Sequence, residues 1–202
     1  MELLLTYSGP LPACQGEEKH TDQKHLIRQH FSRQLKKKFE QLPTLIHWSQ
    51  AVTVGKLVNG AFEMDAHDKH TFAFCEVETC GYKGLAIVNS YNGLACHLDI
   101  EILRRAIPGG VLTAGGDIDN RLKPLLDALA MPLRPNQVPG SMWGKGERLY
   151  CLLADDSLVS KLTIDIQRWD EEAKDPTENE WVQLRVKANI FPFEIRAYHV
   201  GF

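Results

Sequence analysis

The sequence predicts an α+β domain in which a mixed β-sheet is covered on one face by helices. Three observations support this fold class. The segment 23–42 has the periodicity of an amphipathic helix, several segments after 71 alternate apolar and polar residues as strands do, and the segment 118–129 returns to helical spacing. Strands that are apolar on one face and polar on the other are typical of a sheet packed on one side.

The size and composition fit a single domain spanning 1–202. Hydrophobic residues make up 44% of the chain, which is enough for a core. No apolar run approaches the roughly 18 residues of a membrane helix, and no basic stretch precedes the apolar N-terminus. We therefore expect a cytoplasmic protein without membrane association. The net charge of −3 argues against binding nucleic acid through overall charge alone.

The N-terminal part contains the first expected strand, at 3–7, and the first expected helix, at 23–42. The apolar stripe of this helix repeats every four residues through Ile27, Phe31, Leu35 and Phe39. The basic residues Arg28, Arg33, Lys36, Lys37 and Lys38 occupy much of the remaining surface. Two interpretations stay open for this basic surface: a solvated helix face or a face directed at phosphates. Pro43 is expected to end the helix.

Alternating patterns predict strands at 71–78, 85–90, 94–103, 158–166 and 181–188. Two segments between the predicted elements are expected to be irregular insertions, one at about 44–70 and one at 131–148. The five cysteines lack the spacing of a zinc ribbon, so we expect them to be reduced and structural.

An acidic motif begins the second predicted helix, in the segment 116–129, GDIDNRLKPLLDAL. Asp117 and Asp119 are two residues apart in chain expected to be extended, so their carboxylates should point to the same side. Lys123 follows Asp119 by four residues and Asp127 follows Lys123 by four, which places all three on one helix face.

A second acidic pair, Asp155 and Asp156, stands between an apolar run and an expected strand. Two interpretations of the acidic residues stay open. In the first, Asp119 is an N-cap, Asp117 is a turn residue and Asp127 is a surface acid paired with Lys123, while Asp155 and Asp156 form a β-turn. Alternatively, these acids can form a magnesium site, because Mg²⁺ prefers carboxylate oxygens together with water and substrate phosphate oxygens.

The two motifs together resemble a known family. The segment 116–129, followed by ADDSLV at 154–159, is similar to the signature of the RusA family of Holliday junction resolvases. That family has Asp-x-Asp-Asn, a lysine four residues after the second Asp, an Asp-Ala-Leu helix, and then Asp-Asp before a strand. The resemblance covers the part of the chain from about 94 to 169 and joins two separated motifs in the same order.

The resemblance implies a RusA-like fold in which the two motifs meet at one edge of the sheet. It implies a homodimeric, Mg²⁺-dependent endodeoxyribonuclease that resolves four-way junctions in DNA recombination and repair, with a phage or prophage origin. Asp117, Asp119 and Asp156 would be the catalytic, metal-binding carboxylates, and Lys123 the catalytic lysine. Asp155 and Asp127 would have supporting roles.

Further expectations follow from this hypothesis. Mn²⁺ would substitute for Mg²⁺ because both accept oxygen ligands. Arg121, Lys145 and Arg148 would contact backbone phosphates of the DNA. Two other functions stay open: a catalytically idle module of this fold that binds DNA or protein, and a metal-dependent nucleotide phosphohydrolase.

Overall fold

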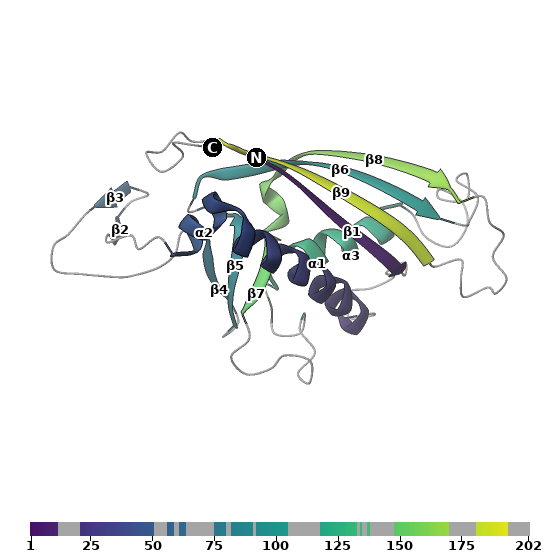
Figure 1. Cartoon of the computed structure of the whole chain (residues 1–202), viewed down its shortest axis with the longest axis horizontal. Coiled ribbons are helices and arrows are strands. Elements are labelled where there is room, and N and C mark those ends of the chain that lie inside the picture. The colour runs from purple at the N-terminus through teal and green to yellow at the C-terminus, as the bar shows by residue number, and fades with distance from the viewer. Residues whose placement is uncertain are drawn as a thin grey trace.

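A computed structural model describes most of the chain (Figure 1). The described residues are 1–11, 21–50, 56–58, 61–63, 75–79, 82–90, 92–104, 118–132, 134, 137, 148–169 and 181–193. Helices and strands are mixed along these residues, in agreement with the predicted α+β class.

The described part contains three α-helices: α1 (Thr21–Gln41), α2 (Pro43–Gln50) and α3 (Ile118–Leu129). The predicted apolar stripe of α1 is confirmed, because Ile27, Phe31, Leu35 and Phe39 are all buried. Pro43 ends α1 as expected but also begins α2, where the missing N–H of proline costs nothing. The expectation of an irregular segment from 44 is therefore wrong over the length of α2.

A four-stranded sheet has the order β1-β9-β6-β8, formed by β1 (Glu2–Pro10), β9 (Trp181–Pro192), β6 (Leu94–Arg104) and β8 (Val159–Arg168). The strand β9 pairs antiparallel with both β1 and β6, whereas β6 and β8 are parallel. The predicted alternation of β6 is confirmed, because Cys96, Leu98, Ile100 and Ile102 are buried. The helices α1 and α3 lie on one side of this sheet (Figure 1). On β6 and β9 the residues between the buried ones are mostly half-buried or exposed.

A separate three-stranded sheet has the order β4-β5-β7, formed by β4 (Glu76–Thr79), β5 (Tyr82–Val88) and β7 (Leu149–Leu153). The expectation of one sheet is therefore wrong: two mixed sheets share the helices α1 and α3. A short hairpin, β2 (Lys56–Val58) and β3 (Ala61–Glu63), lies within the expected insertion at 44–70. The insertion at 131–148 lies mostly outside the described residues.

Two buried asparagines build the connection from β5 in one sheet to β6 in the other. The Asn92 side chain donates to the Ile87 carbonyl at 2.7 Å and accepts from the amides of Asn89 and Leu94, each at 3.2 Å. Gly93 follows with φ of 64°, a left-handed conformation that glycine adopts without strain. This tight turn lets the chain change sheets within a few residues.

Among the described residues, the larger of two apolar clusters lies between the helices and the two sheets, and the smaller one consists of Ala86, Met131, Leu149 and Cys151. The larger cluster includes residues of α1, α3, both sheets and Leu45 of α2. The described cysteines Cys75, Cys96 and Cys151 are free and buried, as expected for reduced structural cysteines. Among the described residues, no helix combines the length and the apolar character needed to cross a membrane.

Candidate acidic site

The second acidic pair lies beside the C-terminal end of α3 because α3 and β7 are joined there. Ala130 forms an isolated parallel bridge with Leu153, the last residue of β7. The Met131 amide donates to the Leu153 carbonyl at 2.9 Å, and the Ala154 amide donates to the Val88 carbonyl of β5 at 2.8 Å. These hydrogen bonds fix the chain immediately before Asp155.

A small cavity of about 40 Å³ opens where these elements meet. Its lining brings together three acids from both sequence motifs, Asp127, Asp155 and Asp156. The remaining lining residues are Arg28, Ala130, Met131 and Gln137. The structure thus places Asp127, the last acid of the first motif, next to the Asp-Asp pair.

The Arg28 side chain of α1 supports this cavity from the inside of the protein. Its guanidinium group donates to the carbonyls of Asp127 at 2.7 Å, Ala130 at 3.1 Å and Gln137 at 3.2 Å. Only 2% of Arg28 is exposed, and burial lowers its pKa. The basic pattern of the helix suggested either a solvated surface or a phosphate-facing surface. Both interpretations are wrong for Arg28, because its side chain is buried. It holds the C-terminal end of α3 in place by satisfying carbonyls that the helix leaves unpaired.

Asp127 forms an ion pair with Lys24 of α1. The Lys24 ammonium lies 2.8 Å from the Asp127 carboxylate, and both side chains are largely buried. The interpretation in which Asp127 pairs with Lys123 is therefore wrong. Lys123 is exposed on α3, so its ammonium is available to a ligand at the surface.

Asp155 and Asp156 have different environments. Asp155 caps the short 3₁₀ helix at Asp156–Leu158, and its Oδ1 accepts from the Ser157 amide at 2.8 Å. Hydrogen bonds from the side chain and main chain of Ser157 lower the pKa of Asp155. Asp156 is exposed. The sequence suggested a β-turn at these two residues, and the structure has a short 3₁₀ helix there that Asp155 caps. Asp156 is the acid of the pair that faces solvent.

The other half of the acidic motif lies at the N-terminal end of α3. Asp119 stands in the first turn of this helix, so the expectation of extended chain is wrong at this residue. Its side chain is outside the described residues, as is all of Asp117. The helical rise separates Asp119 from Asp127 by about 12 Å along the axis. Lys123 lies midway between them on the same face.

The three residues expected to contact DNA have different positions. Arg121 is half-buried, and its guanidinium donates to the Leu11 carbonyl at 2.8 Å. Arg148 is exposed, but it precedes β7 and so lies at the end of that strand opposite the Asp-Asp pair. Lys145 lies outside the described residues.

Within the described ranges, no group of three metal-ligating side chains is arranged to hold a metal. The described carboxylates nevertheless have suitable chemistry, because Mg²⁺ binds through one or two carboxylates and retains water. The Asp127 carboxylate already pairs with the Lys24 ammonium, and the Asp155 carboxylate accepts a hydrogen bond from the Ser157 amide. Among the described carboxylates of this cavity, Asp156 is the exposed one, and its chemistry fits a metal that also takes water and phosphate oxygens.

Comparisons of the chain with family models, with curated proteins and with solved structures gave no match.

Sequence reasoning missed Arg28 and Lys24, which hold the C-terminal half of α3. Both are basic residues on a helix with many basic residues, and composition alone suggests solvent exposure. The spacing contained a usable signal. Lys24, Arg28, Phe31 and Leu35 follow one another at intervals of three or four residues, so both basic residues border the apolar stripe.

Proposed function

We propose that the chain is a Mg²⁺-dependent endodeoxyribonuclease with a RusA-like fold, acting on four-way DNA junctions. One observation carries the proposal: Asp127, on the helix that has Asp119 in its first turn, lines the same cavity as Asp155 and Asp156. The last acid of the first motif is thus a neighbour of the second motif, and this supports a site shared by the two motifs.

The residues have distinct proposed roles. Asp156, Asp119 and Asp117 would hold the metal, which when bound supplies polarisation of the phosphate and activation of a water. Lys123, exposed one helical turn from Asp119, would neutralise negative charge on the phosphate during cleavage. Arg28 and Lys24 would keep α3 fixed against the Asp-Asp pair without contacting DNA. The products would be a 5′-phosphate and a 3′-hydroxyl.

The dimensions of the cavity favour a polymeric substrate over a nucleotide. A volume of about 40 Å³ holds only a few water molecules. A nucleotide phosphohydrolase needs an enclosed pocket for the base, and ligand pockets of that kind have volumes of about 300 Å³ or more. An exposed Asp156 and an exposed Lys123 instead suit a phosphodiester approaching from solvent. A homodimer, with one site for each of two strands, would produce symmetric nicks.

The first experiment is cleavage of a labelled synthetic four-way junction, beside linear duplex and single-stranded DNA of the same sequence. Symmetric nicking of the junction with Mg²⁺ or Mn²⁺, and none with EDTA, is the expected result. The variants Asp117→Asn, Asp119→Asn and Asp156→Asn should abolish cleavage while retaining the fold and the affinity for the junction.

Asp165→Asn is the matched control, because Asp165 is an exposed acid of β8 whose carboxylate accepts from Gln167 at 2.7 Å. This variant should cleave as the wild-type protein does. Cleavage by Asp156→Asn at the wild-type rate would refute the assignment of the site. A folded wild-type protein that binds the junction but cleaves no DNA would identify an idle binding module instead.

A further inference from the structure

A second group of charged side chains lies at the other end of the four-stranded sheet, away from the Asp-Asp pair. Arg104 is the last residue of β6, and Arg168 is the last residue of the parallel neighbour β8. The register pairs Arg104 with Arg168, so their Cα atoms are about 4.8 Å apart and their side chains leave the same face of the sheet. Arg121 approaches this face from the first half of α3.

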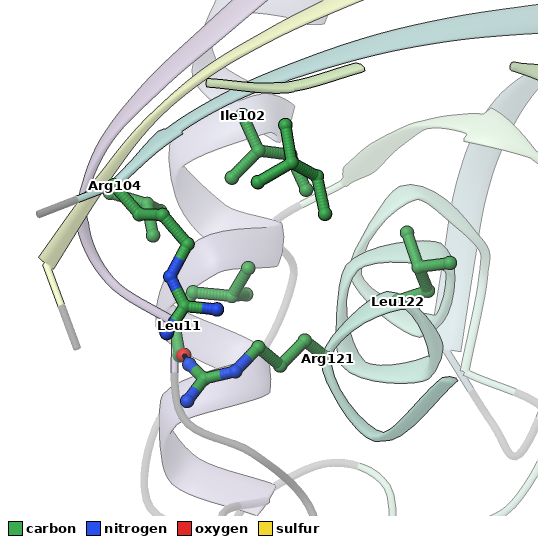
Figure 2. A pocket seen from close by; sticks show the side chains of 7 residues that line it. Leu11, Ile102, Arg104, Arg121 and Leu122 are labelled. Atoms are coloured by element: carbon green, nitrogen blue, oxygen red, sulfur yellow. Dashed lines mark hydrogen bonds between the residues drawn. The ribbon is translucent and has the colours of Figure 1, made fainter. Parts of the chain in front are cut away.

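The side chains of Arg104 and Arg121 extend toward each other from the sheet and the helix, beside the main chain of Leu11 (Figure 2). Arg104 is 7% exposed. Within the described part of the chain, the Nε atoms of both arginines are buried and have no hydrogen-bond partner. The Leu11 carbonyl, a neutral acceptor, accepts from the Arg121 guanidinium at 2.8 Å.

The surroundings make the proximity of these cations costly. Arg104 and Arg121 line a small cavity, whose surface is almost wholly apolar, together with Leu11, Ile102, Leu122, Ile166 and Val182. Burial, and then repulsion by Arg121, lower the pKa of Arg104. Like charges in apolar surroundings repel strongly unless an anion lies between or beside them. Bidentate guanidinium groups are the protein donors best matched to a phosphate.

We propose that Arg104, Arg121 and Arg168 form a binding site for a phosphodiester group of the DNA backbone. The phosphate would lie beside the exposed Arg168, on the side where the guanidinium groups of Arg104 and Arg121 approach each other (Figure 2). Arg121 is two residues from Asp119, so the bound phosphate would lie near the N-terminal end of α3, away from the Asp-Asp pair. In this form the inference rests on the proposed nuclease function.

The test measures DNA binding without cleavage. Binding of a labelled four-way junction is followed by fluorescence anisotropy in EDTA, between 50 and 200 mM salt. Arg104→Gln, Arg121→Gln and Arg168→Gln should each weaken binding by about threefold to tenfold and reduce the slope of log K against log salt by about one, as for the loss of one phosphate contact.

Arg185→Gln is the matched control. Arg185 lies on the opposite face of the sheet, is exposed and pairs with Glu101 at 3.1 Å, so the variant removes one positive charge without touching the cluster. Its affinity and salt slope should equal those of the wild-type protein. Arg168 is exposed, so its variant should fold even if the replacement of the buried Arg104 does not.

A second arm distinguishes the source of the phosphate. Thermal unfolding is measured in inorganic phosphate and in chloride at equal ionic strength. Stabilisation by phosphate that is lost in Arg168→Gln, with DNA binding unchanged, would show a site for free phosphate and overturn the proposal. Unchanged DNA affinity and salt slope in Arg168→Gln and Arg121→Gln would also overturn it.

The outcomes separate the site from the nuclease activity. Cluster-dependent DNA binding by a wild-type protein that cleaves no junction would support the phosphate site and refute the proposed nuclease. Junction cleavage that is unaffected by all three arginine variants, with unchanged binding, would support the nuclease and refute the phosphate site.

Discussion

The Lys24 ammonium lies 2.8 Å from the Asp127 carboxylate, which joins the first turn of α1 to the last turn of α3. Both side chains are mostly buried, with 13% and 20% exposed. Replacing Lys24 by Met should lower the free energy of unfolding by about 1–2 kcal/mol, because Asp127 then keeps a charge without a partner. Urea denaturation measures this change.

The matched control for that prediction is Lys161→Met on the exposed strand β8. It should change the free energy of unfolding by less than about 0.5 kcal/mol. Equal stabilities of the Lys24 and Lys161 variants would contradict a stabilising role of the ion pair.

His25 should make stability depend on pH in the weakly acidic range. It is fully buried, and burial together with the nearby charge of Arg28 lowers its pKa to about 4, against an ordinary value of 6.5. Between these two values the unfolded chain takes up a proton that the folded protein does not. The free energy of unfolding should therefore fall by about 2–3 kcal/mol as the pH decreases from 6.5 to 4.

Chemical denaturation at a series of pH values measures how the free energy of unfolding changes with pH. His25→Gln should have a flatter profile between pH 6.5 and 4, whatever its absolute stability. His30→Gln, which removes a histidine from the same helix, should keep the wild-type slope. If the free energy of unfolding of the His25 variant changed with pH as steeply as that of the wild-type protein, His25 would be excluded as the source of the pH dependence.

Asp155 should contribute stability that disappears only in strong acid. Its pKa is below the ordinary value because Ser157 donates to it, so its contribution is complete above about pH 4 and is lost as the pH falls through the lowered pKa. Above pH 4, Asp155→Ala should cost about 0.5–1 kcal/mol, as for the loss of a helix cap.

The difference between the wild-type protein and Asp155→Ala should therefore shrink below pH 4. Glu40→Ala, at an exposed position near the end of α1, serves as the control and should show no comparable difference. A difference that grows on acidification would contradict the hydrogen bonding of Asp155.

The thiols of Cys75, Cys96 and Cys151 should be inert in the folded protein. Burial raises the pKa of each thiol to about 12, so almost no thiolate is present at pH 7.5. Iodoacetamide labelling followed by peptide mass spectrometry should modify these three cysteines only at the rate of unfolding. Rapid labelling of any of them in native buffer, with full labelling in denaturant as the reference, would contradict their burial.

The parts of the fold that were predicted correctly are those with a strong local pattern. The helix α1 and the strands β6 and β9 each have a regular apolar period over many residues. The strand β7 is short, and Leu149, Cys151, Leu152 and Leu153 are all buried, so it has no alternation to detect. The division into two sheets depends on pairing between distant strands, which no local pattern encodes.

The candidate site shows the same distinction. The sequence indicated Asp127, Asp155 and Asp156, and the structure brings them to one cavity. The residues that hold them there were not predicted, because Lys24 and Arg28 act through burial and through contacts with residues about a hundred positions away. Local charge predicts exposure, and here tertiary contacts override that tendency.

The packing around Gly84 of β5 has a consequence for tracing this motif in other sequences. A Cβ at Gly84 would lie 2.7 Å from the Met131 sulfur and 2.9 Å from the Leu149 carbonyl oxygen, so residues at both ends of the segment 131–148 converge on one glycine. The free energy of closing a loop grows only slowly with its length, by about 0.6 kcal/mol for each doubling. The number of residues between the Asp-x-Asp-Asn and Asp-Asp motifs can therefore vary at little cost in folding free energy. A search pattern for distant relatives should leave that gap open and require a small residue in the preceding strand.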